Sequence, residues 1–71
     1  MEITYDKEAD AIYIKFRDGT FGSNKVIDRE TIIDLDKKGN ILGIELLSVS
    51  KRIPIDSLSQ ISVKNLIDVS A

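Results

Sequence analysis

The sequence predicts an α+β fold that is mostly β, a four-stranded antiparallel meander with one or two short C-terminal helical turns. Twelve of the 71 residues are isoleucine, whose β-branched side chain suits the pleated surface of a sheet. Apolar residues also alternate with a period of two in four successive segments, which is typical of strands. The alternation stops after Ser48, where helical spacing begins.

The predicted strands are the segments over which the alternation holds. They cover residues 3–5, 12–16, 27–35 and 42–46. Residues 6–10 are short and polar, so the first two strands should pair as a hairpin. Residues 18–24 contain two glycines and are predicted to form a longer loop. Residues 36–40 predict another hairpin, because Gly39 can adopt the positive φ angle that a type I turn with a bulge needs.

Residues 51–71 are predicted to form a helical tail that packs on the sheet of residues 1–50, within a single domain. Pro54 cannot donate a hydrogen bond to a central strand, but it suits the first turn of a helix. The apolar residues at helical spacing are Ile55, Leu58 and Ile61, followed by Val63, Leu66 and Ile67 after the N-cap candidate Ser62. An extended strand over residues 61–69 is the alternative for this part of the chain.

The predicted core consists of the apolar residues that share one face of each strand, with two from the tail. Its members are Ile3, Tyr5, Ile12, Ile14, Phe16, Ile27, Ile33, Leu35, Leu42, Ile44, Leu46, Leu58 and Ile61. Ile32, Ile41 and Leu47 fall on the opposite face of their strands, so both faces of the last two strands carry apolar side chains. Either a partner covers this second face, or a β-bulge near Gly43 changes the register.

A homodimer is the favoured explanation of the second apolar face. A domain of 71 residues buries only about 60% of the surface of its unfolded chain and is marginal alone. Disulfides, structural metals and self-association are the usual remedies, and the chain has no cysteine. We therefore expect a homo-oligomer, with a symmetric dimer as its form.

Composition excludes several classes of function. The absence of histidine and cysteine removes the commonest zinc ligand, thiolate metal sites and the usual general base at neutral pH. We therefore expect no enzyme activity, no catalytic residue and no cofactor. A net charge of −2 argues against nucleic acid as a partner. No apolar run approaches the roughly 18 residues of a membrane span, and Met1 is not followed by a signal peptide, so we expect a cytoplasmic protein without membrane contact.

Two acidic segments raise the alternative of a small-ligand or divalent-metal-binding domain. Carboxylates alternate in residues 6–10, and carboxylates are the ligands that Ca²⁺ and Mg²⁺ prefer. The segment from Asp34 to Glu45 has much of the spacing of a calcium-binding EF-hand loop. Lys38 stands where that loop needs an oxygen ligand, and the flanks predict strands in place of helices. Hairpin turns are the favoured interpretation of both segments, so we assign no metal-ligating residue.

A protein partner is the favoured alternative to a ligand. Apolar side chains beyond those that one small core needs are typical of interaction surfaces. The predicted partner surface lies where such residues adjoin basic ones after the last strand. It comprises Leu47, Lys51, Arg52 and Ile53.

Two spaced blocks of sequence occupy residues 1–50. The first is Met1-x-Ile3-x-Tyr5-Asp6-x-Glu8-x-Asp10-Ala11-x-Tyr13-Ile14-x-Phe16. The second is Ile33-x-Leu35-Asp36-x-x-Gly39-x-Ile41-x-Gly43-Ile44-Glu45-Leu46-Leu47-x-x-Ser50. Together they resemble the signature of the domain of unknown function 2283 family of small prokaryotic proteins.

The resemblance implies a short, strand-rich protein with a small helical end and no assigned activity. Some members of that family are encoded beside small toxin-like ribonuclease proteins, which implies an antitoxin-like or accessory role. A small protein-binding or regulatory module is therefore the predicted function. Each residue of the motif also has a structural use in a hairpin, so the motif itself does not indicate an active site.

Overall fold

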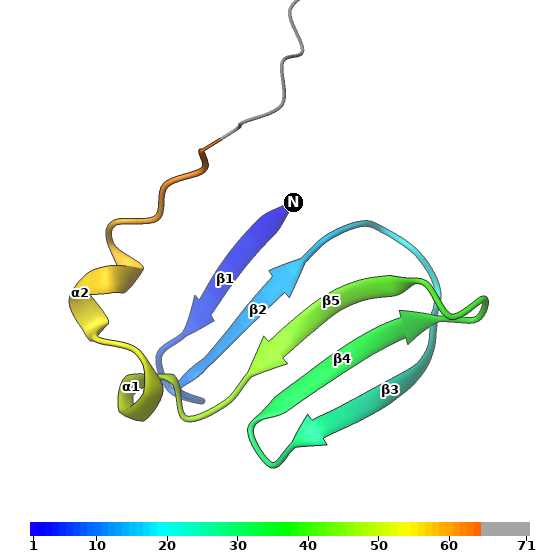
Figure 1. Cartoon of the computed structure of the whole chain (residues 1–71), viewed down its shortest axis with the longest axis horizontal. Helices are drawn as coiled ribbons and strands as arrows, with labels where there is room; N and C mark the ends of the chain where they lie inside the picture. The colour runs from blue at the N-terminus through cyan, green and yellow to red at the C-terminus, as the bar shows by residue number, and fades with distance from the viewer. Residues whose placement is uncertain (65–71) are drawn as a thin grey trace, which may run out of the picture.

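The computed structural model describes residues 1–64, which form one antiparallel sheet followed by two short helices (Figure 1). The strands are β1 (Glu2–Asp6), β2 (Ala11–Lys15), β3 (Phe21–Asp28), β4 (Thr31–Asp36) and β5 (Ile41–Leu46). The helices are α1 (Val49–Arg52) and α2 (Ile55–Leu58). The prediction of a mostly β, antiparallel fold with short helical turns after the sheet is confirmed.

The strands pair in the order β1-β2-β5-β4-β3, so the predicted four-stranded meander is wrong in both strand number and strand order. β1 and β2 form a hairpin, while β3, β4 and β5 form a meander that joins it where β5 pairs with β2. After β2 the chain crosses to the far edge of the sheet and returns strand by strand (Figure 1). A period-two pattern identifies a strand but not its neighbour, so the alternation carried no information about this crossing.

The fifth strand arises because the predicted strand over residues 27–35 contains a tight turn. The carboxylate of Asp28 accepts a hydrogen bond from the backbone N–H of Glu30 at 2.8 Å, which holds the turn between β3 and β4. A two-residue turn by itself shifts the alternation by one residue, but Ile27 is an extra residue on β3 and restores it. The sequence pattern therefore runs through the turn unchanged. β3 also begins at Phe21, inside the segment predicted as a loop.

A β-bulge in β5 decides which face its apolar residues occupy. Asp34 lies opposite Gly43 and Leu35 lies opposite Ile41, so Leu42 is the extra residue on β5. Ile41 therefore shares a face with Leu35. The bulge that the sequence offered as an alternative to a second apolar face is confirmed.

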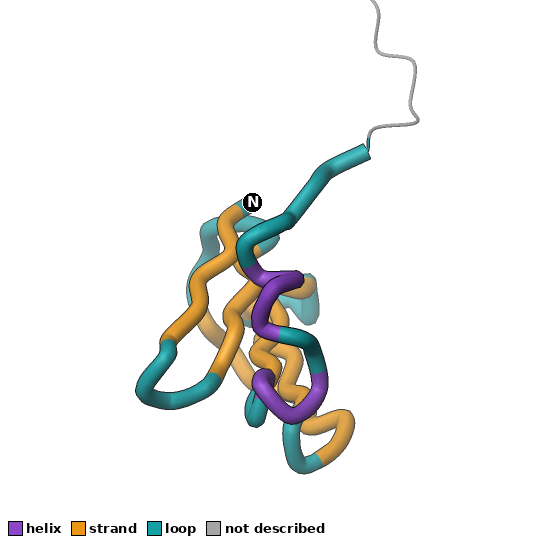
Figure 2. Tube along the Cα trace, turned by 90° about the vertical axis from the view of Figure 1, so that its left-hand side faces the viewer, coloured by secondary structure: helices purple, strands orange, loops and turns teal. Residues whose placement is uncertain are grey.

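The tail is attached at one end of the sheet. Both helices lie to the same side of the β1–β2 hairpin (Figure 2). The backbone N–H of Val49 donates to the carbonyl of Asp10 at 3.0 Å, and the Val49 side chain is fully buried. Residues 61–64 form neither the predicted helical turn nor a strand, and Ile61 is exposed. Leu66 and Ile67, assigned above to the second turn, lie outside the described residues.

Few of the side chains that the structure describes are buried. The buried hydrophobic residues among them are Ala11, Ile12, Leu42 and Val49. Ile12 and Leu42 confirm part of the predicted core, whereas the placement of Ile3, Phe16, Ile27 and Ile61 in the core is wrong because all four are exposed. The remaining predicted members are half-buried. A sheet buries its apolar face only under a second layer, and the tail supplies such a layer at one end alone.

Candidate protein interface

Four isoleucines from four adjacent strands form a row across one face of the sheet. Ile3 on β1 lies opposite Ile14 on β2. Ile14 lies opposite Ile44 on β5, which in turn lies opposite Ile33 on β4. Residues paired in this way point to the same side of antiparallel strands. Ile3 is exposed and the other three are half-buried, so the row is open to solvent.

Phe16, Leu35 and Ile41 extend this row at the end of the sheet away from the helices. We call the four isoleucines together with these three residues the isoleucine face. Its most open members are Ile41, Ile3 and Phe16, with 44%, 41% and 37% of their surface exposed. Large apolar side chains that are contiguous and exposed to this degree are typical of interaction surfaces.

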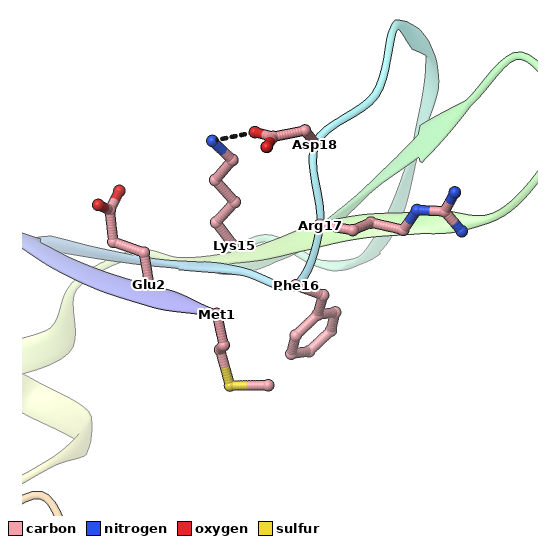
Figure 3. Close-up of a pocket in the computed structure, with 6 residues that line it drawn as sticks. All are labelled: Met1, Glu2, Lys15, Phe16, Arg17 and Asp18. Atoms are coloured by element: carbon pink, nitrogen blue, oxygen red, sulfur yellow. Dashed lines mark ion pairs between the residues drawn. The ribbon is translucent and has the colours of Figure 1, made fainter.

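The corner of the sheet near Met1 separates apolar from charged side chains. Around a shallow open pocket there, Phe16 and Met1 lie on one side of the strands, while Glu2, Lys15 and Asp18 lie on the other (Figure 3). The Lys15 ammonium contacts an Asp18 carboxylate oxygen at 2.6 Å, which raises the pKa of Lys15 and lowers the pKa of Asp18. The charges at this corner therefore leave the isoleucine face free of competing ion pairs.

The opposite face of the sheet carries polar side chains that bond to one another. Tyr13 on β2 donates a hydrogen bond from its hydroxyl to Oδ2 of Asp34 on β4 at 3.2 Å. The tyrosine ring passes over Gly43 on β5, where an added Cβ would lie 2.5 Å from the hydroxyl oxygen. Burial first, and then the nearby Asp34 carboxylate, raises the pKa of Tyr13. Its edge strand β3 also exposes Val26 and Phe21, but the Tyr13–Asp34 hydrogen bond occupies the centre of this face, which makes that centre the weaker candidate for docking.

The predicted partner surface is divided by the fold. Arg52 is turned toward the β3–β4 turn, where Nη1 donates to the Glu30 carbonyl at 2.6 Å and Nη2 donates to Thr31 Oγ1 at 3.0 Å. Lys51 is exposed, whereas Leu47 and Ile53 are half-buried. The guanidinium therefore attaches the tail to the sheet, while Arg52 stays exposed, as Lys51 is.

A carboxylate at the β1–β2 turn holds the other side of the tail. Asp10 accepts hydrogen bonds from the Ser50 hydroxyl at 2.7 Å and the Ser50 backbone N–H at 3.1 Å. The Tyr5 hydroxyl also donates to it, at 3.4 Å. The hydrogen bond from the Ser50 side chain is the main reason that the pKa of Asp10 is lowered. Asp10 has φ 52°, a left-handed conformation that Asp and Asn tolerate better than most residues.

The acidic turns use their carboxylates to hold backbone. Asp6 accepts the N–H groups of Glu8 and Ala9, each at 3.1 Å. Asp36 accepts hydrogen bonds from the backbone N–H groups of Lys38 and Asn40 at 2.9 and 2.8 Å, and one from the Asn40 side chain at 3.0 Å. These hydrogen bonds lower the pKa of Asp36, and the bond from the Asn40 side chain has the largest effect. Within residues 1–64 the structure brings together no group of three side chains able to hold a metal ion.

The isoleucine face differs from the binding surface that the sequence suggested. Its members were assigned to the core, because an alternating apolar strand looks the same whether its face is covered or open. The available signal was quantitative: the chain is rich in isoleucine but short of elements that could form a second layer. That imbalance favoured an interface, but it did not point to this face of the sheet.

Comparison with known proteins agrees with the two blocks of sequence described above. The model of the family described as "Protein of unknown function (DUF2283)" matches residues 2–50. The chain is also similar to "Uncharacterized protein MJ0789" of Methanocaldococcus jannaschii, with 36% identity over 72 aligned positions. The alignment covers all of this chain and 59% of that relative, which is therefore considerably longer. No solved structure matches the chain significantly.

Within residues 1–64 there is no helix with the length and apolar character of a membrane span. The family match covers the whole sheet, from the start of β1 to Ser50, which contacts Asp10. All five strands and both sequence blocks, apart from Met1, fall within the matched segment, whereas α2 lies beyond it. The chain belongs to the DUF2283 family of proteins of unknown function.

Proposed function

We propose that this chain is a small protein-binding or regulatory module that acts in the cytoplasm, through its isoleucine face and without catalysis. The observation that carries the proposal is the row Ile3, Ile14, Ile44 and Ile33, which crosses four strands and is left open by residues 1–64. An apolar row of this kind gains stability when another protein surface covers it.

The energetics favour such a contact. Each Å² of apolar surface removed from water contributes about 25 cal/mol. Isoleucine is stiff at χ1, so its side chain loses little rotamer freedom when a partner packs on it. A rigid sheet also presents these side chains in fixed positions, which lowers the cost of ordering an interface.

The non-catalytic part of the proposal is supported by the chemistry of the side chains. The chain has neither histidine nor cysteine. The carboxylates of Asp6, Asp10 and Asp36 accept hydrogen bonds from the turns and the tail, so each of them has a structural role. No specific contact in residues 1–64 favours the alternative of a small-ligand or divalent-metal-binding domain.

The more specific form of the proposal is an antitoxin-like accessory protein that accompanies a toxin-like neighbour. Its support is the role that the family resemblance implies. In this form the partner contributes an apolar patch that covers the isoleucine face.

The test is affinity capture from an extract of the native host, with the tagged full chain as bait and mass spectrometry as readout. The binding-face variants are Ile3→Lys and Ile41→Lys. The matched controls are Thr4→Lys, the next residue on β1, and Val26→Lys, because both residues are exposed on the opposite face. We expect a stoichiometric protein, either a different protein or an untagged copy of the chain, that the face variants lose and the controls retain.

Two results would contradict the proposal. One is a folded bait that recovers no stoichiometric protein at all. The other is a protein that binds the face variants and the controls equally, since its binding would then not depend on the isoleucine face. A ribonuclease-like protein encoded beside this chain among the captured partners would support the antitoxin-like form.

A further inference from the structure

We propose that the occupant of the isoleucine face is a second copy of this chain, so that two sheets pack face to face as a symmetric sandwich dimer. The inference rests on the proposed function in one respect, because it takes the same face as a protein-binding surface. It goes further by naming the partner and the geometry of the complex.

The first argument is the size of the core. Among the side chains that the structure describes, Val49 is the one that is fully buried. A single-layer sheet of this size lacks the interior that small domains need, and the chain has no cysteine with which to form disulfides. The cover on the isoleucine face must therefore be present whenever the chain is folded. A second copy meets that requirement, because it is synthesised together with the first.

The second argument is the symmetry of the row. A two-fold axis that relates two face-to-face sheets lies in the plane between them. If the axis runs along the strands, Ile3 faces the partner's Ile33 and Ile14 faces the partner's Ile44. If it runs along the row, each isoleucine faces its own copy. Both arrangements place isoleucine against isoleucine across a spacing of about 10 Å, the normal distance between packed sheets.

The third argument is charge. The four side chains of the row, on β1, β2, β5 and β4, are all uncharged. The next residue across the sheet is Lys25, which lies opposite Ile33 on the edge strand β3. A partner with charged groups at its centre would bury them without counterions, which is costly. A second copy presents an uncharged centre and keeps its lysine at the edge, where water still reaches it. The centre of a dimer through this face therefore buries no charged side chain.

The tail leaves room for this partner. Its hydrogen bonds reach Asp10 at the β1–β2 turn and Thr31 at the start of β4, both at the same end of the sheet. Their positions within the strands place the isoleucine row and its extension through Phe16, Leu35 and Ile41 farther from that end. The helices lie at that same end (Figure 1). A second sheet can thus cover the face without displacing α1.

The test is sedimentation equilibrium of the full chain from about 10 μM to 1 mM, together with circular dichroism as a check on folding. We expect a mass twice the 7.9 kDa of one chain. Ile3→Lys and Ile41→Lys are expected to raise the dimer dissociation constant by about tenfold or more, because each puts a charge into the apolar interface. Thr4→Lys and Val26→Lys, on the opposite face, are expected to leave the constant unchanged within about twofold.

A second measurement does not depend on weakening the dimer. The chain has no cysteine, so Ile41→Cys and Val26→Cys each introduce a single thiol. We expect alkylation of the Ile41→Cys variant to slow by about tenfold or more as its concentration rises through the dissociation constant, while the Val26→Cys variant reacts at a constant rate. Equal behaviour of the two thiols would overturn the inference.

The outcomes separate this inference from the proposed function. A folded chain that stays monomeric to 1 mM overturns the dimer, yet the proposed function survives if the face variants still lose a different protein in the capture experiment. The assigned face is wrong if neither Ile3→Lys nor Ile41→Lys changes the dimer dissociation constant, or if Val26→Lys raises it instead. A monomer that also captures no protein overturns both proposals.

Discussion

The hydroxyl of Tyr13 on β2 reaches the carboxylate of Asp34 on β4, although β5 lies between the two strands. The contact is possible because Gly43 on β5 has no side chain, and the tyrosine passes through the space that one would fill. The hydrogen bond between these two residues, which are 21 positions apart, therefore depends on β5, a strand that comes later in the chain than both. It also occupies the centre of the polar face, and so contributes to the difference between the two faces.

Gly43→Ala is expected to destabilise the protein by about 1–3 kcal/mol, the usual cost of overpacking. The added Cβ would lie 2.6 Å from the carbonyl oxygen of Ile14, a backbone atom that cannot move without disturbing the β2–β5 pairing. Urea unfolding followed by circular dichroism measures the change. Tyr13→Phe is the companion variant, since it removes the hydrogen bond to Asp34 and leaves the backbone contact in place. If Gly43→Ala were as stable as the wild type, β2 and β5 would move apart at this point without cost, and the overpacking explanation would be wrong.

Asp10→Asn is expected to lower stability at neutral pH, with an effect that shrinks in acid. The lowered pKa of Asp10 means that its carboxylate is better stabilised in the folded chain than in the unfolded one, mainly by Ser50 and with help from Lys51. Such stability is fully present above the unfolded pKa of about 4 and is lost as the pH falls through the lower folded pKa. Asparagine accepts a left-handed φ, so the backbone at this position is preserved.

Urea midpoints at pH 7 and at pH 2–3 check this expectation for Asp10. The difference between wild type and variant should be largest at pH 7. Asp6→Asn serves as the comparison, because Asp6 lies in the same turn but binds only the neighbouring backbone. A difference between wild type and Asp10→Asn that stays constant from pH 7 to pH 2 would refute the electrostatic account.

Arg52→Ala is expected to loosen the tail and to destabilise the protein by about 1 kcal/mol, the typical contribution of a hydrogen bond. Its guanidinium bonds the Glu30 carbonyl, which also accepts the N–H of Leu47 at 2.9 Å. Amide hydrogen exchange should therefore rise at Leu47 and Val49 more than in the β1–β2 hairpin. Lys51→Ala is the control, since Lys51 is the exposed basic neighbour. Unchanged exchange at Leu47 in the Arg52→Ala variant would mean that the arginine does not hold the tail.

Titration with Ca²⁺, Mg²⁺ or Mn²⁺ is expected to release no measurable heat at millimolar metal. The carboxylate of Asp36 accepts three hydrogen bonds within its own turn, two from backbone N–H groups and one from the Asn40 side chain. A cation would have to displace them and would also meet Lys38 in the same turn. Calorimetry decides the matter. Heat that is present in the wild type and absent in Asp36→Asn would revive the metal-binding alternative.

Local features were predictable because they depend on neighbours in the sequence. Gly39 does adopt a positive φ, at 87°, in the turn where a glycine was required. The β1–β2 hairpin follows from two alternating segments joined by a short polar turn, and α2 follows Pro54 as the proline predicted. The turn at residues 29–30 is not visible in the alternation, because the extra residue Ile27 on β3 offsets the shift of one residue that a two-residue turn introduces.

The order of the amino acids is enough to show a mostly β, antiparallel protein of the DUF2283 family, with more apolar residues than its own small core can use. Only the tertiary structure decided that β5 pairs with β2, that a bulge at Leu42 turns Ile41 toward Leu35, and that the isoleucines align as one open row. The reason is physical. Alternation specifies that a strand has an apolar side, whereas strand order and the position of the tail specify which of those sides meet and whether anything covers them.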